Sequence, residues 1–500
     1  MNASLLPGRR PAVAAAIGLA LAGCASGPDF KPPAPPATAA AAHPYTAAAL
    51  PARTASAPVA GGAAQRWNPA QDVPALWWQL YRSPALDQLI RGAIERSPSL
   101  AAAQAALRQA QALYEADAGN KRWPGVTGSL GAQRARSSQI ASGTRNGVTY
   151  NLFNASVNVA YTVDAFGATK RELEGLGAQI DYQHDQLEAA YLTLTANLVT
   201  TAIQEASLRA QLAAVEAVVA AESSSLQLVQ MQSGIGAVPR SAVLSQQAQL
   251  AQTRASLPAL EKALAQTRQT LAVLAGLPPG TAGLPEFDLA TLELPQELPL
   301  SLPSALVRQR PDIRASEALL HQASAQLGVA TANQYPQITL SASLGSQAAK
   351  LSQMFTSPAT AWTLGAGLVA PIFNGGALQA KRRAAVAALD QAQAQYRQVV
   401  LGAFLDVANT LQALDADARG LRAQAEAAEL ARQSLQLVSE QYGAGAVSYL
   451  ALLEAQRAYQ QTQVALVQAQ AARYADTAAL FQALGGGWWR RDGAAVAASN

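Results

Sequence analysis

The sequence predicts a mixed α/β chain in which one unit, made of paired strands and a long antiparallel helical hairpin, occurs twice. Three observations predict this fold: an internal repeat of four landmarks, long proline-free segments with a seven-residue apolar period, and short segments of alternating apolar and polar residues. Of the 500 residues, 50% are hydrophobic and only 14% are charged. This composition excludes intrinsic disorder as the state of the whole chain.

The internal repeat rests on landmarks that follow one another in the same order in both halves. The first copy carries Arg96–Leu100, Trp123–Val126, Phe166–Gly167 and Gly234–Val238, and the second carries Arg310–Ile313, Tyr335–Ile338, Phe373–Gly375 and Gly443–Val447. Pro98 precedes Pro124 by 26 positions, and Pro311 precedes Pro336 by 25. We therefore expect a first repeat at 67–276, a proline-rich linker at 277–303, a second repeat at 304–488 and a tail at 489–500.

Each repeat contains a proline-free segment in which mostly apolar residues recur at a seven-residue spacing. The first series comprises Leu187, Leu194, Thr201, Leu208 and Val215, and the second comprises Val400, Val407, Leu414, Leu421 and Leu435. This period is typical of coiled-coil helices. A helix over Lys170–Gln232 would be ~95 Å long at 1.5 Å per residue. The glycine pairs Gly234/Gly236 and Gly443/Gly445 predict turns that send a second helix back antiparallel.

Four shorter segments alternate apolar and polar residues, as strands with two unlike faces do. The stronger runs are Phe153–Val163 and Ile338–Leu344, and the weaker runs are Val126–Ala132 and Leu364–Leu368. A half-buried soluble sheet would show the same alternation. The strand length and the lack of a partner layer for the polar face favour strands of an outer-membrane barrel, with loops at Arg134–Thr149 and Ser346–Thr360 at their outer ends.

Four strands cannot close a barrel. Two open edges would leave backbone N–H and C=O groups unpaired in hydrocarbon at several kcal/mol each. The chain is therefore expected to meet copies of itself, and the strand count alone leaves two, three or four copies open.

The N-terminus predicts a lipoprotein signal peptide at 1–23, with Arg9 and Arg10 before a short apolar stretch. Leu21–Cys24 resembles the lipobox of bacterial lipoproteins, and Cys24 is the single cysteine of the chain. We expect diacylglycerol and palmitate chains on Cys24, an outer-membrane location, and a Pro/Ala-rich tether over 24–66.

Composition and motifs exclude several function classes. One cysteine and three scattered histidines offer no metal cluster, and a formal net charge of +4 with dispersed cations gives no reason to expect a nucleic-acid partner. No stretch of about 20 uninterrupted apolar residues predicts a spanning helix. No P-loop, Gly-x-Ser-x-Gly or His-Glu-x-x-His motif is present, so neither an enzyme nor a resident cofactor is expected. Asp415 and Asp417 are interpreted as a solvated surface pair.

Several longer motifs resemble the lipoprotein branch, or NodT type, of the TolC-like outer membrane factors. They are the lipobox with Gly27–Phe30, Trp77–Trp78, Leu302–Leu306 leading into Arg310–Ala315, and Ala483–Trp488. The resemblance implies a homotrimer with a twelve-stranded outer-membrane barrel, four strands per chain, continued by a coiled-coil tunnel through the periplasm. It further implies a periplasmic adaptor (membrane fusion) protein and an inner-membrane pump, commonly of the resistance-nodulation-division class. The implied function is passive export of small molecules and drugs.

The resemblance also implies two kinds of functional position. The adaptor would meet the hairpin tips at Gly234, Ile235, Gly236, Gly443, Ala444 and Gly445. The periplasmic aperture would be formed by Leu450 and Glu454, with Tyr442 before the turn. Leu450 and Glu454 are four residues apart on one helix face, so a trimer would present an apolar ring and a ring of three carboxylates that attracts cations.

An alternative hypothesis is a lipid-anchored coiled-coil spacer or adaptor that never crosses the outer membrane. It would keep the seven-residue period but would have no use for four amphipathic strands.

Overall fold

The computed structural model describes residues 26–34, 45–46, 50–69, 71–138, 140, 147–300 and 303–491. The chain divides into two compact units. The sheet unit comprises Met1–Pro33, Ala106–His184 and Ala315–Arg397, and the helical unit comprises Ala34–Ala105, Asp185–Arg314 and Gln398–Asn500. The predicted signal peptide, Cys24 and residues 492–500 lie outside the described residues.

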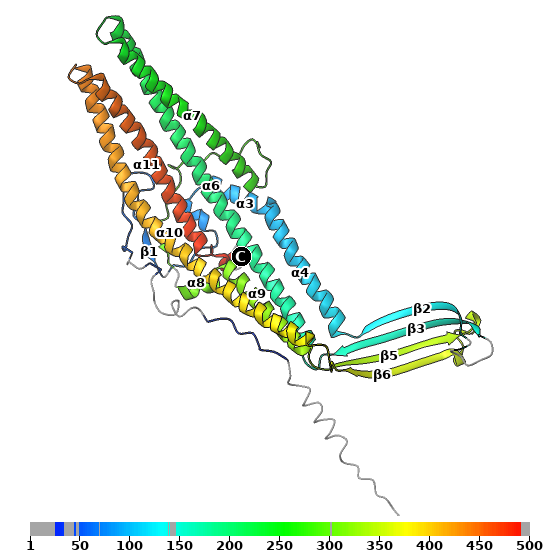
Figure 1. Ribbon diagram of the computed structural model, residues 1–500. Helices are drawn as coiled ribbons and strands as arrows, with labels where there is room; N and C mark the ends of the chain where they lie inside the picture. Colours follow the sequence, from blue (N-terminus) through cyan, green and yellow to red (C-terminus); the bar gives the residue numbers. More distant parts are fainter. Residues whose placement is uncertain are drawn as a thin grey trace, which may run out of the picture. The chain divides into compact units, whose positions relative to one another are not determined.

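The two halves of the chain contain the same elements in the same order (Figure 1). The first half has α4 (Pro98–Arg122), β2 (Gly125–Arg136), β3 (Thr149–Val163), α6 (Ala168–Gly234) and α7 (Arg240–Leu274). The second half has α9 (Pro311–Ala332), β5 (Gln337–Ala348), β6 (Thr360–Val369), α10 (Ala377–Gly443) and α11 (Tyr449–Ala483). The helices α6 and α10 both have 67 residues, and α7 and α11 both have 35. The predicted helical hairpins are confirmed.

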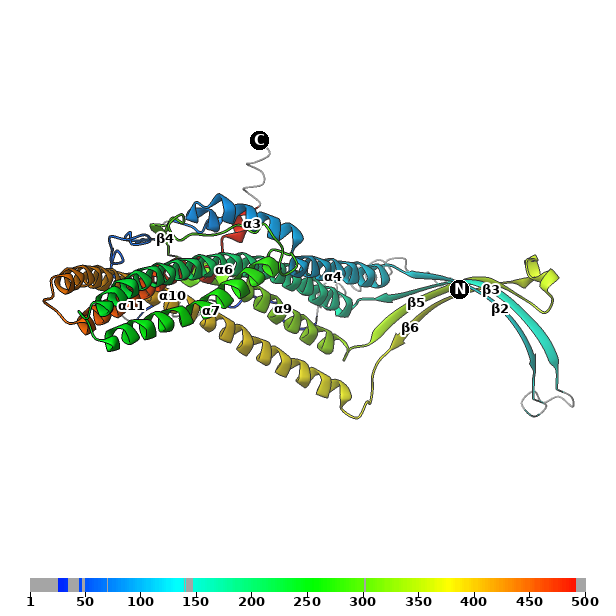
Figure 2. The same ribbon diagram turned by 90° about the horizontal axis from the view of Figure 1, so that it is seen from above.

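The sheet unit contains an antiparallel sheet in the order β2-β3-β5-β6 (Figure 2). Its register places like residues side by side: Leu344 lies between Val157 and Trp362, and Ser343 lies between Asn158 and Thr363. The hydroxyls of Ser343 and Thr363 are 2.7 Å apart. A register slip of one residue would exchange the two faces, so this alternation fixes the pairing. The predicted apolar and polar faces are confirmed.

The apolar face of the sheet is exposed in the single chain. Its large exposed side chains are Val126, Leu130, Val157, Leu340, Leu344, Trp362, Leu364 and Leu368. Both edge strands are also uncovered, since every residue of β6 is exposed and β2 is exposed along most of its length. A sheet with an apolar face and two free edges needs another surface to cover it.

The loops at the far ends of the strands are shorter than expected. The strand β2 continues to Arg136 and β5 continues to Ala348, each past the predicted loop start. The second loop also contains two short 3-10 helices, η2 (Leu351–Gln353) and η3 (Ser357–Ala359). The ladder continues through these polar residues because their partners on β3 extend equally far.

The helical unit has a core in which aromatic residues pack against the long helices. The 3-10 helix η1 (Trp77–Tyr81) precedes α3 (Pro84–Arg96), which begins at an N-cap where the Ser83 side chain accepts from the Leu86 amide. The rings of Trp77 and Phe481 are stacked with centroids 5.4 Å apart. The predicted seven-residue positions Val400, Val407, Leu414 and Leu421 are fully buried, which confirms the seam of α10 up to Leu421, and Leu435 is half-buried.

Parts of the predicted tether and of the predicted linker are packed in the helical unit. The end of the predicted tether forms β1 (Arg66–Asn68), which pairs in parallel with β4 (Glu297–Pro299) inside the predicted linker. The fully buried Arg473 donates to Thr54 Oγ1 at 2.9 Å and to the Ala63 carbonyl at 2.6 Å. A buried guanidinium needs several acceptors, and these extended segments supply them. Residues 50–66 of the predicted tether therefore pack within the helical unit.

Two short helices complete the helical unit, α8 (Pro303–Gln309) and the 3-10 helix η4 (Trp488–Arg490). The helices α6 and α10 each contain an 18-residue window with mean hydropathy of 1.4 and 1.3, so by length and composition both could cross a membrane. The search for uninterrupted apolar runs missed these windows because polar and acidic residues interrupt the apolar ones in both helices. Alanines in the same helices allow close helix packing.

Asp417 is not the solvated residue that the sequence suggested. Its neighbour Asp415 pairs with Arg419 at 3.1 Å, but one carboxylate oxygen of Asp417 is buried without a hydrogen-bond partner. Burial raises the pKa of Asp417 to about 7, and a hydrogen bond with Asp476 of α11 adds to the rise. The Asp417 carboxyl is therefore about half protonated at neutral pH, and its proton can bond across to α11.

We expect Asp417→Asn to stabilise the protein in mildly alkaline solution. The pKa of Asp417 is higher in the folded chain than in the unfolded chain. The contribution of Asp417 to the free energy of unfolding therefore falls as pH rises from about 4 to about 7, and it is constant above pH 7. The amide removes this loss, and the free energy of unfolding should rise by about 1 kcal/mol at pH 8 but hardly at pH 4, after allowance for solvent screening. Thermal unfolding followed by circular dichroism measures this. Asp415→Asn is the control, and an equal gain at both pH values would contradict the raised pKa of Asp417.

Candidate functional site at the hairpin tips

The first hairpin tip is a glycine-dependent turn. Gly236 has a φ of +74°, its amide donates to the Ser233 carbonyl, and the Ala237 amide donates to the Gln232 carbonyl at 2.9 Å. This pair of bonds is the Schellman motif, in which the residue with positive φ is usually glycine. The cap satisfies carbonyls that the end of α6 would otherwise leave unpaired.

The second tip repeats this turn with the same geometry. Gly445 has a φ of +73°, its amide donates to the Tyr442 carbonyl, and the Ala446 amide donates to the Gln441 carbonyl at 2.9 Å. The residues that precede the returning helices, Pro239 and Ser448, have identical backbone angles of φ −73° and ψ 155°. The predicted turns after Gly234 and Gly443 are confirmed, and the duplication extends to single hydrogen bonds.

The outermost tip residues face solvent. Ile235 is 83% exposed, and Gly234, Gly236, Gly443, Ala444 and Gly445 are exposed as well. An apolar side chain this exposed at the end of a hairpin is available to a partner surface.

A groove of about 610 Å³ lies between the two tips. Tyr442 and Leu450 line it together with Gln232, Pro239 and Tyr449. Of the predicted tip residues, Gly443 and Gly445 also line this groove. Leu450 is 61% exposed and Glu454 is exposed one turn further along α11, whereas the intervening Leu452 and Leu453 are buried. The structure thus brings Tyr442 and Leu450 to one groove and leaves Glu454 beyond it.

The two hairpins are joined near their tips by side-chain hydrogen bonds. The Tyr442 hydroxyl donates to Gln232 Oε1 at 2.9 Å, and the Tyr449 hydroxyl donates to Gln246 Oε1. Burial raises the pKa of both tyrosines, so both keep the hydroxyl proton that these bonds require. We call these bonds, together with those in the next paragraph, the polar seam.

The polar seam continues along α11 towards the middle of the hairpins. Arg457 Nε donates to Gln249 Oε1 at 2.5 Å, Gln456 Nε2 donates to Ser225 Oγ at 3.2 Å, and Gln468 Nε2 donates to Gln211 Oε1 at 3.1 Å. Gln249 in turn donates to Glu222 Oε1 at 3.1 Å, and Glu222 is only 1% exposed. The hairpins of one chain therefore meet through amides, hydroxyls and a guanidinium rather than through apolar side chains alone, and a buried carboxylate of the first hairpin holds one of these amides.

Sequence reasoning missed the polar seam. A heptad search scores apolar positions, whereas Gln246, Gln249 and Gln456 occupy buried or half-buried positions of the same helices. The sequence pattern that could have revealed the polar seam is the recurrence of glutamine on α7 and α11. These glutamines are spaced by three residues or by seven or more. Among the described residues, no group of three or more His, Cys, Asp or Glu could hold a metal ion.

The chain matches the family model of outer membrane efflux proteins at residues 89–277 and 302–486, most of its length. The chain belongs to the outer membrane efflux protein family. The efflux protein is 34% identical over 438 residues to the pyoverdine export outer membrane protein OpmQ of Pseudomonas putida, covering 86% of this chain and 92% of OpmQ. It is 27% identical over 470 residues to nodulation protein T of Rhizobium leguminosarum bv. trifolii, covering 90% and 92%.

Among solved structures, the efflux protein is similar to the outer-membrane channel OprN. The TM-score is 0.83 at 30% sequence identity, over 93% of this chain and 100% of that chain. The predicted resemblance to TolC-like factors of the NodT type is thereby confirmed. The efflux protein is an outer-membrane transport protein with the helix and sheet content of these channels.

We expect Gly445→Ala to loosen the second tip and Gly443→Ala to leave it intact. A Cβ at either position would meet no atom within 4 Å, so only the backbone distinguishes them. A left-handed alanine costs roughly 1–2 kcal/mol, whereas alanine is favoured over glycine within a helix. Hydrogen exchange at the Gly445 and Ala446 positions should therefore quicken about fivefold in Gly445→Ala alone. Equal exchange in both variants would contradict the requirement for positive φ.

Proposed function

We propose that three copies of this chain form a passive exit duct across the outer membrane. The observation that supports this most strongly is the four-stranded sheet, whose apolar face and two edges are uncovered in the single chain. In lipid each unpaired backbone group would cost several kcal/mol, so the edges of β2 and β6 must pair with other copies. Three copies give a closed barrel of twelve strands, the arrangement that the family resemblance implies.

The helices carry a matching surface for self-association. Leu401, Leu405, Leu430 and Leu437 of α10 are all more than half exposed in the single chain. Neighbouring copies would bury them and complete a helical tunnel in the periplasm. The chain carries no nucleotide-binding motif, so the driving energy for export must come from a partner.

The hairpin tips are proposed as the contact with a periplasmic adaptor, which would connect the duct to an inner-membrane pump of the resistance-nodulation-division type. The exposed Ile235 and the duplicated glycine turns supply a small, partly apolar surface for this contact. Leu450 and Glu454, with Tyr442, are proposed to form the periplasmic aperture. The polar seam would hold each aperture helix against the first hairpin in the closed duct.

Acylation of Cys24 with diacylglycerol and palmitate is proposed to anchor each copy in the outer membrane. Two or more acyl chains are needed for stable anchoring, since one chain binds only marginally.

The duct and the alternative spacer differ in whether the strands reach the cell exterior. We expect Ser352→Cys, between β5 and β6, to react with a membrane-impermeant thiol reagent on intact cells, because the acylated Cys24 offers no competing thiol. Ser241→Cys, an exposed position at the periplasmic tip, is the control and should react only after the outer membrane is opened. Chemical crosslinking of the same cells should give trimers. Labelling of neither position on intact cells, with monomers on crosslinking, would favour the spacer.

We expect Leu450→Ala and Glu454→Ala to raise the single-channel conductance of the trimer in planar bilayers about twofold or more. Removing either ring widens the narrowest point, and loss of Glu454 should also weaken cation selectivity. Glu426→Ala changes an exposed carboxylate on α10 away from the tip and should leave the current unchanged. If all three variants conduct as the parent does, the aperture assignment is wrong although the duct itself stands.

A further inference from the structure

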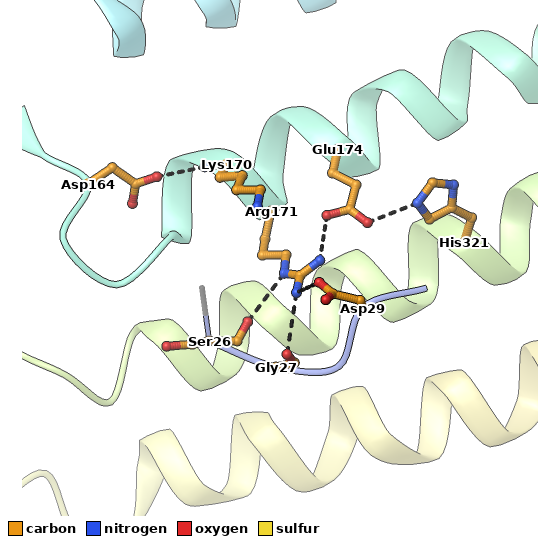
Figure 3. Close-up of polar contacts among 8 residues, drawn as sticks. All are labelled: Ser26, Gly27, Asp29, Asp164, Lys170, Arg171, Glu174 and His321. Atoms are coloured by element: carbon orange, nitrogen blue, oxygen red, sulfur yellow. Dashed lines mark hydrogen bonds and ion pairs between the residues drawn. The ribbon is translucent and has the colours of Figure 1, made fainter. Parts of the chain in front are cut away.

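The N-terminal segment Ser26–Phe30 is bound by a buried arginine in the first turn of α6 (Figure 3). The Arg171 side chain is 3% exposed, and its Nη2 donates to Asp29 Oδ1 at 2.7 Å. It also donates to the carbonyl oxygens of Ser26 and Gly27, both at 3.3 Å. A fourth bond, from Nη1 to Glu174 Oε2 at 2.7 Å, ties the guanidinium to its own helix. Three of its four acceptors therefore belong to the N-terminal segment.

A second set of contacts holds the same segment against α9. The Phe30 ring stacks on the His321 imidazole with centroids 4.2 Å apart and an angle of 15° between the planes. His321 Nε2 is 2.9 Å from Glu174 Oε1, so the histidine and Arg171 share one carboxylate. The Ser26 amide donates to the Phe166 carbonyl at 3.0 Å, in the connection between β3 and α6.

The fit requires glycine on both sides of the contact. Gly27 has a φ of +90°, and a Cβ there would lie 2.6 Å from the Cα of Gly328 on α9. A Cβ on Gly328 would lie 2.7 Å from Cγ of Arg171. Gly27 and Gly328 thus allow the segment to approach α9 closely enough for Arg171 to reach its carbonyls.

The buried charge of Arg171 also depends on hydrogen bonds to the segment Ser26–Phe30. Burial alone would lower the pKa of Arg171, but hydrogen bonds to Glu174 and Asp29 outweigh it and raise the pKa. Burial would raise the pKa of Glu174, but bonds from Arg171 and His321 lower it instead. Without Ser26–Phe30 the buried guanidinium would keep only Glu174 as an acceptor, and a buried charge with too few partners is costly.

The position of this contact along the chain suggests its purpose. The strand β3 ends at Val163 and α6 begins at Ala168, so Phe166 and Arg171 lie at the end of the sheet. Two peptide steps separate Cys24 from Ser26, and two residues of extended chain span at most about 7 Å. A lipid on Cys24 would therefore enter the membrane close to the ends of the strands.

We propose that Arg171, Glu174, His321 and Gly328, here termed the N-terminal clamp, are a docking site for the chain's own segment Ser26–Phe30. The clamp holds the acylation position beside the strand ends, so that lipid and barrel enter the same leaflet together. This inference rests on the acylation and the membrane barrel proposed above. Arg171 acts here as a positioning residue for the anchor.

The experiment uses the full-length acylated trimer in phospholipid nanodiscs, with a spin label on Ser26→Cys. The Ser26 side chain takes no part in the clamp, whose bonds use its backbone groups. In the parent we expect an immobilised spectrum. Arg171→Ala should mobilise the label and raise its collision rate with a water-soluble nickel chelate severalfold. Lys170→Ala, an exposed cation one residue away, should not. Arg171→Lys should restore little of the label's immobilisation, because one ammonium group cannot reach acceptors in several directions.

Asp29→Ala is a second variant that tests the clamp even if Arg171→Ala misfolds. The Asp29 side chain is 81% exposed, and its loss leaves the ion pair between Arg171 and Glu174 in place. This variant should increase label mobility to an intermediate degree. A label equally immobile in Arg171→Ala, Asp29→Ala and the parent would overturn the clamp, and so would a label already mobile in the parent.

Incorporation of labelled palmitate and planar-bilayer conductance are measured on the same preparations. Loss of acylation or of conductance in the parent would count against the proposed function instead. A mobile label in a variant that still forms conducting, acylated trimers supports the clamp independently of the proposed function.

Discussion

Every backbone N–H and C=O group that lies in lipid needs a hydrogen-bond partner from the protein, and this requirement governs the sheet. Within the described chain the pairs β2–β3, β3–β5 and β5–β6 satisfy the interior of the sheet, whereas the outer edges of β2 and β6 have no partner strand. An apolar face that ends in two open edges is stable in water only if it is covered, and in lipid only if the sheet closes on itself. The proposed assembly of identical copies rests on this one constraint.

The helical hairpins meet a different requirement, because they must remain stable in water over a great length. The fully buried Val400, Val407 and Leu414 supply a continuous apolar seam on α10, and alanine keeps the neighbouring helices close. The duplicated Schellman caps then reverse the chain without leaving helix-end carbonyls unpaired. Each half of the chain solves the same two problems with the same elements, which explains why α6 and α10 have equal length.

Local periodicity predicted most of this fold, whereas contacts between distant residues were not predictable. The seven-residue series and the alternation around Val157 are properties of neighbouring residues, and both predictions are confirmed. The bond from Arg473 to Thr54 joins residues 419 positions apart, and neither residue belongs to a periodic pattern. The same reason applies to His321, whose ring stacks on the distant Phe30, and to Asp417, whose partner lies on another helix. At the candidate site, the turn glycines were predictable from spacing, but the glutamines of the polar seam were not.

The chemistry of that seam also determines how the two hairpins of one chain can part. A neutral amide that leaves its partner can bond to water instead, so each such exchange changes the free energy by only about 0.5–1.5 kcal/mol. Separating interlocked leucines would expose hydrocarbon and cost about 25 cal/mol for every Å² uncovered. Between α7 and α11 the bond of Tyr449 to Gln246 near the tip is neutral, whereas the bond of the charged Arg457 to Gln249 is worth about 1.5–3 kcal/mol. Bonds of this kind near the tip can be exchanged for bonds to water one at a time, at a lower free-energy cost per step than the exposure of an apolar interface.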